Sequence, residues 1–413
     1  MPQGKSFPLL SYSVCAALVA LTFGQANAAQ VPAGTQLAAK QEIVRHIKDE
    51  PASLDPAKVV GLPEAQVARD LFEGLVNQDA TGKSIPGVAE SWQNQNNQVF
   101  LFTLRKDAKW SNGDPVTAQD FVYSWQRLVD PKGSATGAWF AALAGFSNAD
   151  AIIAGKMPVD KLGVTAVSPT LLRVTLDKPV PYFVSLLANF SLFPVHKTTV
   201  EKFGDDWTKP GNLVGNGAYV LKDRVVNEKL VLEPNPHYWD HAHTVLTKVT
   251  FVPINKESNA TKRYLANDID ITESFPKDQY KKLMHDLPGQ VYTPYQLGTY
   301  YYAFNTKRAP TDDARVRKAL SLSIDRKIIA EKVLGTGEKP AWRFTPDVTS
   351  GFKPAESELQ QYSQEELNAQ AKSLLAAAGY GPSKPLHLTL LYNTSESHQK
   401  IAIAVASMWK KTL

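Results

Sequence analysis

Residues 288–306 read PGQVYTPYQLGTYYYAFNT, and the last part of this stretch alternates between two faces. Tyr300, Tyr302 and Phe304 would share one face of a β-strand, because successive side chains of a strand point to opposite sides. Gly298 enters this strand without a side chain, which is typical of a place where a ligand or a second backbone comes close. We therefore predict a half-buried strand that carries the chain from one half of the molecule to the other through a binding cleft. An ordinary core strand is the alternative interpretation.

The N-terminal segment, residues 1–28, has the composition of a secretory signal peptide. It carries one charge, Lys5, followed by an apolar run over residues 7–23 and by Ala-Asn-Ala at residues 26–28, the pattern of a cleavage site. Cys15, the only cysteine of the chain, lies inside the apolar run. Cleavage after this segment would therefore leave a protein without a disulfide or a thiolate metal site.

The remaining sequence has the size and charge of a multi-domain globular protein. About 385 residues are enough for two or three domains, and no later apolar run is long enough to span a membrane. The chain contains 45 basic and 40 acidic residues, and the basic residues form no block. This distribution argues against a dedicated nucleic-acid-binding protein.

Alternating apolar residues, turn residues and helix caps predict a mixture of strands and helices. Thr117 with Asp120, and Ser363 with Glu366, form capping boxes, and Gly379 has the position of a C-terminal cap. Strands are expected near residue 42 and at residues 98–104, 164–167, 171–176, 219–221, 229–232, 249–252, 269–271 and 386–392. Helices are expected at residues 61–74, 117–128, 258–266, 313–322 and 363–379, and from residue 398 onward. The pattern is that of α/β domains with mixed sheets.

Catalytic motifs are weak. The Ser-x-x-Lys pattern of some serine acyl-transferases begins at Ser274, Ser350 and Ser397, but no Lys-Thr-Gly or Ser-Asp-Asn partner accompanies it. The sequence also lacks Gly-x-Ser-x-Gly, His-Glu-x-x-His and a phosphate-binding loop. We therefore expect a protein without catalysis. A secreted Ser-Lys peptidase or amidase is the alternative from another class.

Four histidines could bind a metal or a ligand: a group of three at residues 237–243, and His398. His237, His241 and His243 are dense enough in the sequence to bind zinc or copper, but no carboxylate or thiolate motif completes a site, which favours a plain polar loop. His398 follows the polar loop at residues 393–397, at a predicted strand-to-helix junction, where α/β sheets often present ligand-binding groups. A water-exposed histidine at the start of a helix is the alternative for His398.

Several longer motifs occur in order along the chain. They are Asp55-Pro56, LFEGL at residues 71–75, PGVAESW at 86–92, LRKDAKW at 104–110, DPVTAQDF at 114–121, NGAY at 216–219 and NPHYW at 235–239. From residue 42 to residue 413 the sequence resembles the peptide and nickel class of solute-binding proteins that serve ABC importers. Within the class it is most similar to the branch that binds cell-wall peptides, and the general oligopeptide-binding branch is next. The stretches that carry this finer resemblance are VRHIKDEPASLDPAK at 44–58, QLGTYYYAFNT at 296–306 and EELNAQAKSLLAAAGYGPSKPL at 365–386.

The resemblance implies an α/β, three-lobed periplasmic binding protein of type II, with mixed sheets and a hinged cleft for peptides. Lobe I would comprise residues 29–72 and 197–297, the small lobe II residues 73–196, packed on lobe I, and lobe III residues 298–413. In this class two lobes close on an extended peptide, whose main chain is hydrogen-bonded like an added strand. Family members continue beyond Leu413, which implies a C-terminally truncated fold here, with an incomplete lobe III and with the aspartate for the peptide α-amine outside this sequence.

The resemblance also assigns residues to the ligand site. Gly61 and Leu62 would line one wall, and Glu273 and Tyr301 would lie beside the cleft. The residues that would face the ligand from the other lobe are Asn393, Ser395 and His398. The loop at residues 133–137 lacks the proline-aromatic pair of relatives, so no side-chain contact is predicted from it.

On this resemblance we expect a monomeric periplasmic receptor that captures the cell-wall tripeptide L-Ala-γ-D-Glu-meso-diaminopimelate and related peptides and docks on an inner-membrane ABC permease. Gly298 stands where the general oligopeptide-binding branch has a cysteine, which favours the cell-wall peptide branch. No cofactor, metal, nucleic-acid partner or membrane insertion is expected. Broad oligopeptide capture is the alternative within the class.

Overall fold

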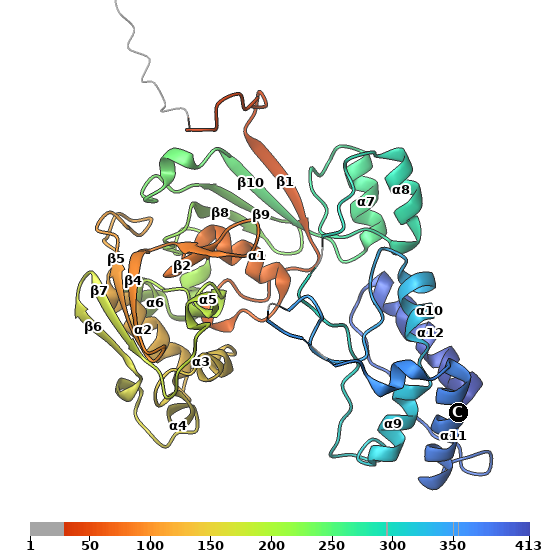
Figure 1. Ribbon diagram of the computed structural model, residues 1–413. Helices are drawn as coiled ribbons and strands as arrows, with labels where there is room; N and C mark the ends of the chain where they lie inside the picture. Colours follow the sequence, from red (N-terminus) through yellow and green to blue (C-terminus); the bar gives the residue numbers. More distant parts are fainter. Residues whose placement is uncertain (1–28, 295, 350, 354) are drawn as a thin grey trace, which may run out of the picture.

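The computed structural model describes residues 29–294, 296–349, 351–353 and 355–413. The predicted signal peptide, residues 1–28, lies outside the described residues. Figure 1 shows a part rich in strands, formed by the chain up to residue 253, and beside it a part that contains the helices from residue 257 onward. Among the helices of the described ranges, none is both long and apolar enough to cross a membrane.

A four-stranded sheet joins the two ends of the strand-rich part. Its strands, in spatial order, are β1 (Glu42–Ile47), β10 (Lys248–Pro253), β9 (Lys229–Pro234) and β8 (Tyr219–Val225). β8 and β9 form the predicted hairpin, and β1 pairs in parallel with β10. The sheet shares one apolar cluster with α1 (Leu62–Leu71), which ends three residues before the predicted Gly74. The carboxyl ends of β1 and β10 lie together, and the chain leaves the sheet there.

A second four-stranded sheet lies below the first in Figure 1. Its order is β4 (Ala89–Gln95), β5 (Val99–Leu104), β7 (Leu171–Thr175) and β6 (Val164–Ser168), with all neighbours antiparallel. The predicted strand at 98–104 and the hairpin at 164–176 are confirmed. The smaller elements of this region are β2 (Val76–Gln78), β3 (Ser84–Pro86), α3 (Ala138–Ala144), α4 (Ala149–Ile153) and α5 (Phe183–Leu186), whereas α6 (Lys197–Phe203) packs against the cluster of the first sheet.

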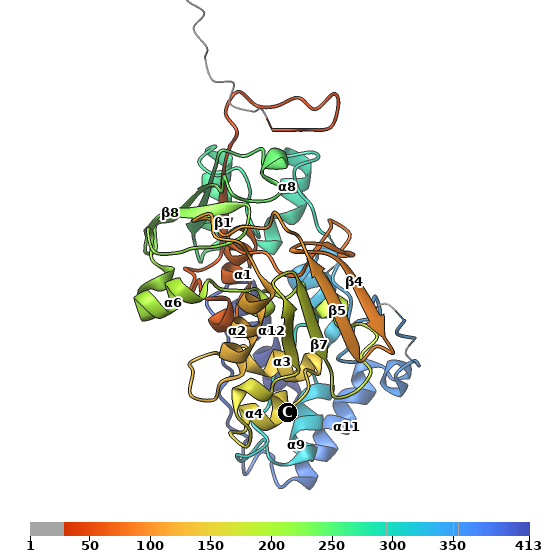
Figure 2. The ribbon, with the colours of Figure 1, turned by 90° about the vertical axis from the view of Figure 1, so that its left-hand side faces the viewer.

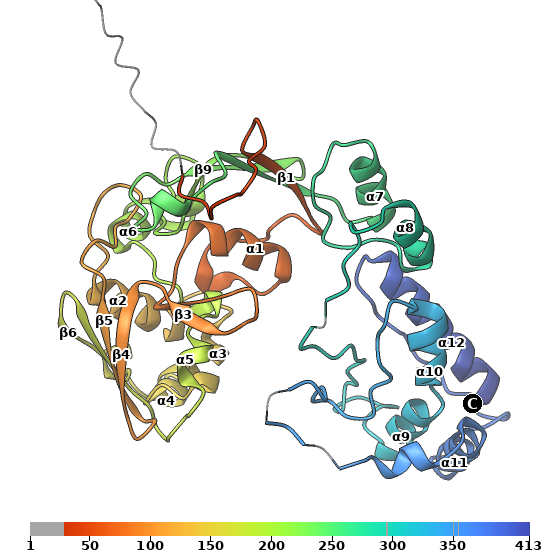
Figure 3. The same cartoon turned by 45° about the horizontal axis from the view of Figure 1, so that its top comes forward.

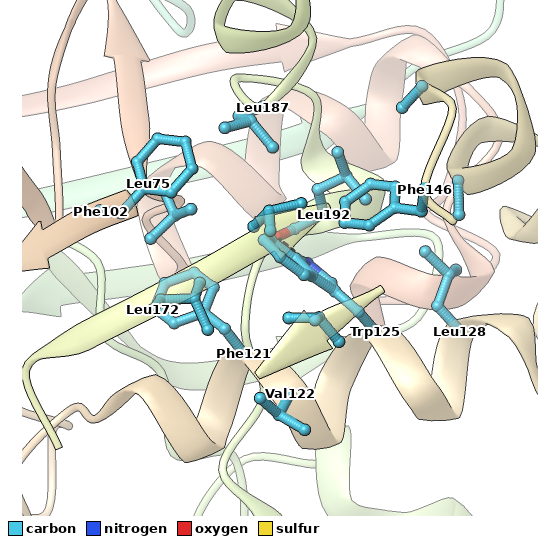
Figure 4. Packing of buried hydrophobic residues seen from close by; sticks show 14 of the residues in the cluster. Leu75, Phe102, Phe121, Val122, Trp125, Leu128, Phe146, Leu172, Leu187 and Leu192 are labelled. Atoms are coloured by element: carbon cyan, nitrogen blue, oxygen red, sulfur yellow. Dashed lines mark hydrogen bonds between the residues drawn. The ribbon is translucent and has the colours of Figure 1, made fainter. Parts of the chain in front are cut away.

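The core of this second region is built around Trp125, on α2 (Ala118–Val129). α2 begins with the predicted capping box, in which Asp120 accepts the Thr117 backbone N–H at 2.7 Å. The Trp125 ring lies edge-on to Phe121 and Phe146, with centroids 5.7 and 4.9 Å away (Figure 4). Its Nε1 donates a hydrogen bond of 2.9 Å to a backbone carbonyl, so the ring is 1% exposed without an unpaired polar atom.

The described residues from 257 onward form six α-helices. They are α7 (Glu257–Leu265), α8 (Tyr280–Asp286), α9 (Ala314–Leu322), α10 (Arg326–Ile328), α11 (Gln364–Ala377) and α12 (Glu396–Thr412). α9 and α11 lie side by side in Figures 2 and 3 and share an apolar cluster, against which Trp409 of α12 packs. α11 starts with the predicted capping box at Ser363 and is followed by Gly379 at φ +87°, as a C-terminal cap requires.

Three predicted strands are not formed. Residues 296–305 and 386–392 have no strand partner in the part of the chain that the structure describes, and residues 269–271 contribute only a single bridge from Ile271 to Arg45. Alternation in the sequence decides which side chains face a core. A β-strand also needs a neighbouring strand to which its backbone can hydrogen-bond. The alternation survives only in part: Tyr302 and Phe304 are half-buried and Tyr301 is 59% exposed, but Tyr300, predicted on the buried face, is 46% exposed.

Two ion pairs link residues 277–278 to later segments of the chain. Lys277 Nζ lies 3.4 Å from Glu338 Oε1, and Lys400 Nζ lies 2.8 Å from Asp278 Oδ1. Residues 277–278, which the sequence assigns to lobe I, are therefore in contact with segments of the predicted lobe III. The stretch at residues 288–306 connects α8 with α9 (Figure 1).

Candidate functional site

The end of β1 is a junction at which chain segments far apart in sequence are tied together. His46 is 1% exposed; its Nε2 donates to the Ile254 carbonyl at 2.8 Å, and its Nδ1 accepts the Glu273 backbone N–H at 3.2 Å. The backbone donor at Nδ1 fixes the tautomer with the proton on Nε2. Burial lowers the pKa of His46 below its ordinary value. His46 thus joins the segment that leaves β10 to the segment that carries Glu273.

Glu273, a predicted ligand-binding residue, is held at this junction. Its Oε2 accepts the backbone N–H of Lys48 at 3.0 Å. The preceding Ile271 bridges to β1, since its carbonyl accepts the His46 backbone N–H at 2.8 Å. The carboxylate is therefore positioned by the last residues of β1 rather than by a helix or strand of its own.

The predicted residues Asn393, Ser395 and His398 meet at the start of α12. Ser395 is the N-cap of the helix and its Oγ accepts the His398 backbone N–H at 3.4 Å. The His398 ring is hydrogen-bonded through Nδ1 to the side-chain oxygen of Asn393, and its centroid lies 4.8 Å from that of Tyr300. Burial, and after it the charge of Lys48, lower the pKa of His398. Ser395 brings the start of α12 to the end of β1, because Lys48 Nζ lies 3.4 Å from its Oγ.

The other predicted residues make no hydrogen bond or ring contact with this cluster in the described ranges. Tyr301 packs its ring on Phe344, 5.0 Å between centroids. Leu62, in the first turn of α1, is 66% exposed. The preceding Gly61 leaves room for a carboxylate, because a Cβ there would lie 2.5 Å from Glu64 Oε2. At Gly298 a Cβ would meet no described atom within 4 Å, so packing does not require a glycine there.

Sequence reasoning missed two charged residues of the junction, Lys48 and Glu257. Lys48 Nζ lies 3.1 Å from Glu257 Oε1 and 3.4 Å from Ser395 Oγ. Both residues follow strands of the first sheet at their carboxyl ends, Lys48 after β1 and Glu257 after β10. That edge is where open α/β sheets bind ligands, so the position relative to the strands is a signal that could have found them.

The described residues offer no evident metal site. No group of three His, Cys, Asp or Glu side chains in these ranges could hold an ion, and His243 instead pairs with Asp240 at 2.5 Å. A pocket of about 310 Å³ lies on the strand-rich part, lined by Asp55, Lys58 and Arg127 among others. It contains none of the predicted ligand-binding residues, and its most buried charges, Asp55 and Arg127, are already paired.

A second buried polar network surrounds Glu73, within the LFEGL motif. Glu73 is 2% exposed, and its carboxylate accepts hydrogen bonds from Asn77 at 2.6 Å, Tyr238 at 2.7 Å and Trp239 at 2.6 Å. Arg105 stacks on the Trp239 ring, 3.7 Å from its centroid. Burial raises the pKa of Glu73 to about 7 in spite of these donors. Two motifs far apart in sequence, LFEGL and NPHYW, are thus one structural unit.

The raised pKa of Glu73 predicts a loss of stability towards alkaline pH. Because the folded pKa of about 7 lies above the ordinary 4.5, the contribution of this carboxyl to stability is present below pH 4.5 and is lost as pH rises through 7. The full effect is on the order of 3 kcal/mol. We expect Glu73→Gln to flatten the pH dependence of the free energy of unfolding, measured in urea between pH 4.5 and 8.

Asp70 provides the matched control for this prediction. Burial raises its pKa to about 6, so it titrates in the same range, but it lies outside the Glu73 network. Asp70→Asn should remove a separate and smaller part of the pH dependence of the free energy of unfolding. In the double variant, the effects of the two substitutions should add. An unchanged pH profile in Glu73→Gln would mean that the three donors keep the carboxylate ionised throughout the range.

The comparisons with known proteins agree with this architecture. The model of the family "Bacterial extracellular solute-binding proteins, family 5 Middle" matches residues 83–413. The chain is 70% identical to the periplasmic murein peptide-binding protein MppA of Escherichia coli over 399 residues, 97% of this chain and 74% of that protein. It is 50% identical to the periplasmic oligopeptide-binding protein OppA of Salmonella typhimurium over 406 residues, 98% of this chain and 74% of that one.

Solved structures show the same fold. The structure of the Escherichia coli murein tripeptide binding protein MppA superposes with a TM-score of 0.90 at 72% identity, covering 92% of this chain and 74% of that one. An unliganded open form of MppA, at the same identity and coverage, gives a TM-score of 0.68. The two scores differ although the identity and the coverage are the same.

These relatives also fix the class of activity. They are binding proteins with the mixed helix-and-sheet fold of type II peptide-binding proteins, so the prediction of a binding protein rather than an enzyme is confirmed. Because the family model matches residues 83–413 and the chain covers 74% of a relative to which it is 70% identical, the chain belongs to family 5 of the bacterial extracellular solute-binding proteins.

Proposed function

We propose that the protein is the periplasmic receptor of an ABC peptide importer, which captures murein tripeptide, L-Ala-γ-D-Glu-meso-diaminopimelate, and related peptides and delivers them to an inner-membrane permease. The 70% identity to a murein peptide-binding protein, against 50% to a general oligopeptide-binding protein, carries this proposal. The apolar run and the Ala-Asn-Ala site at residues 26–28 support export by a signal peptide, residues 1–28. We expect a monomer that binds one peptide.

The three-lobe division is part of the proposal. Buried apolar residues fall into three clusters: one from residues 47–72 and 193–251, one from residues 75–192 with Ala57, and one from residues 316–375. They support lobes I, II and III at residues 29–72 with 197–297, 73–196 and 298–413, with Ala57, Phe193 and Val195 as the residues that pack in the cluster of the neighbouring lobe. Separate cores allow lobes to move as units, with the junction at the end of β1 as the hinge.

The proposed ligand-binding residues are Gly61, Leu62, Glu273, Tyr301, Asn393, Ser395 and His398. Residues 299–305 support this assignment, because no described strand pairs with them. A peptide could hydrogen-bond to such a backbone as an added strand, with its side chains in pockets. Ser395 would act through the fold of α12, since it is 5% exposed and bonded within the protein.

Calorimetry tests the proposed ligand. We expect the full-length protein to bind murein tripeptide at least about tenfold more tightly than trialanine, a difference of about 1.4 kcal/mol. Equal affinities would favour the general oligopeptide receptor, and an absence of heat with either peptide would refute peptide capture. Release of cleavage products that Ser397→Ala abolishes would instead support the peptidase.

The second test concerns His398 and Asn393. Replacing both by alanine removes a hydrogen-bonded polar pair and the ring that lies on Tyr300. We expect the affinity for murein tripeptide to fall about tenfold to a hundredfold, because a buried polar contact to ligand is worth a few kcal/mol at most. The double variant Asp240→Ala/His243→Ala removes a comparable exposed pair and should bind like the unaltered protein. Equal affinities of both variants would remove His398 and Asn393 from the site.

A further inference from the structure

Glu257 links the end of β1, the start of α7 and the start of α12, which are far apart in the sequence. Its carboxylate is 2% exposed and lies in the first turn of α7. Oε1 accepts the Ser395 hydroxyl at 3.2 Å and lies 3.1 Å from Lys48 Nζ, and Oε2 accepts the Ser397 hydroxyl at 3.3 Å. A carboxylate this buried is tolerated only when charge and hydrogen bonds compensate it. The end of β1, the start of α7 and the start of α12 are therefore tied at one point.

A reciprocal contact fixes the direction of the two helices at this point. Glu396, in the first turn of α12, accepts the backbone N–H of Ser258 at 2.9 Å and its hydroxyl at 2.9 Å. Each helix start thus receives a carboxylate from the other, Glu257 from α7 and Glu396 from α12. A carboxylate at a helix N-terminus binds free N–H groups and favours the helix dipole. The start of α12 has little freedom to rotate while both contacts persist.

The charges of this junction reach the proposed ligand site. His398 lies one turn into α12, and the charge of Lys48 lowers its pKa while the charge of Glu257 raises it. On the other side, the backbone N–H of Lys48 binds the Glu273 carboxylate at 3.0 Å. Lys48 and Glu257 therefore lie between two groups of proposed ligand-binding residues, Glu273 on the β1 side and Asn393 with His398 on the α12 side.

We propose that Glu257 is a positioning residue of the peptide site: paired with Lys48 and bonded to Ser395 and Ser397, it holds Asn393 and His398 in register with Glu273 across the hinge. The inference rests on the proposed function. The ion pair fixes the distance between Glu273 and the pair Asn393 and His398. It does not itself contact the ligand. Without it, each set keeps its local fold, but their separation is no longer fixed, which weakens a ligand that must contact both.

Peptide affinity is the first readout. In the full-length protein, Glu257→Gln keeps one acceptor for the serines but leaves Lys48 unpaired, and we expect the affinity for murein tripeptide to fall about tenfold to a hundredfold. Lys48→Met should have an effect of similar size. Glu201→Gln, which removes an exposed ion pair with Lys197 on α6, is the matched control and should bind as the unaltered protein does. The melting temperature without ligand is measured for each variant.

The titration of His398, followed by NMR and assigned with His398→Gln, is the second readout and needs no ligand. We expect Lys48→Met to raise the pKa of His398 and Glu257→Gln to lower it. A lower melting temperature of Glu257→Gln with unchanged peptide affinity would overturn the proposal, since the pair would then serve the fold alone. If the unaltered protein binds no peptide, the proposed function fails and the positioning role in a peptide site fails with it; opposite shifts of the His398 pKa would then support only the placement of Lys48 and Glu257 beside His398, and an unchanged His398 pKa would contradict that placement.

Discussion

Replacing Trp125 by alanine is expected to lower the free energy of unfolding by about 3–5 kcal/mol. The indole is 1% exposed and contacts Phe121 and Phe146 edge-on, so its removal leaves a cavity among rings that cannot close over it. The carbonyl of Leu192 also loses its hydrogen-bond donor. A loss of this size is a large part of the stability of a typical domain, and it should fall mainly on the region of the second sheet.

Urea unfolding followed by circular dichroism measures this effect. Trp139→Ala is the matched control, because Trp139 is 62% exposed on α3. It should change the free energy of unfolding by less than about 1 kcal/mol. If both tryptophan variants were equally stable, the packing around Trp125 would not limit the stability of this region. A lowered slope of unfolding against urea for Trp125→Ala would indicate that the region unfolds separately from the rest.

The sequence predicted the elements that depend on local interactions. The capping box of Thr117 with Asp120, the one at Ser363 and the hairpin at residues 219–234 all form where expected, because each needs only neighbours within a few residues or one turn. Residues 299–305 show the limit of this reasoning. Tyr302 and Phe304 are half-buried as the alternation predicts, yet no strand forms, because pairing depends on a second backbone that the pattern of one segment does not reveal.

The candidate site could be predicted only in part for the same reason. His398 and Asn393 lie five residues apart, and the polar loop before a helix pointed to both. Glu257 lies 209 residues from Lys48 and 138 from Ser395, and nothing in its own neighbourhood marks it as more than one carboxylate among many. Its role depends on the parallel pairing of β1 with β10, which brings their carboxyl ends together. Such pairing between distant segments is set by the fold as a whole and is not visible in the sequence around Glu257.

The second large effect is expected at Asp55, in the Asp55-Pro56 motif. Its Oδ1 and Oδ2 accept hydrogen bonds from Arg127 at 3.0 and 2.5 Å, and Oδ1 also accepts the Ala57 N–H at 3.1 Å. The carboxylate is 2% exposed. Removing one member of a buried, bidentate pair leaves the other charge without compensation. We expect Asp55→Ala to lower the free energy of unfolding by about 3 kcal/mol, near the lower end of such losses, because the pocket beside Arg127 admits water.

Arg127→Ala should cost more than Asp55→Ala, because the carboxylate that it leaves behind is 2% exposed, whereas the guanidinium left by the other variant is 23% exposed. The double variant should be more stable than the sum of the two single losses predicts, by at least about 1 kcal/mol, since only the first substitution leaves a buried charge. Urea unfolding of the four proteins gives this coupling energy. Strict additivity would show that the pair contributes no net interaction, and a smaller loss for Arg127→Ala would show that water solvates Asp55 once the pocket opens.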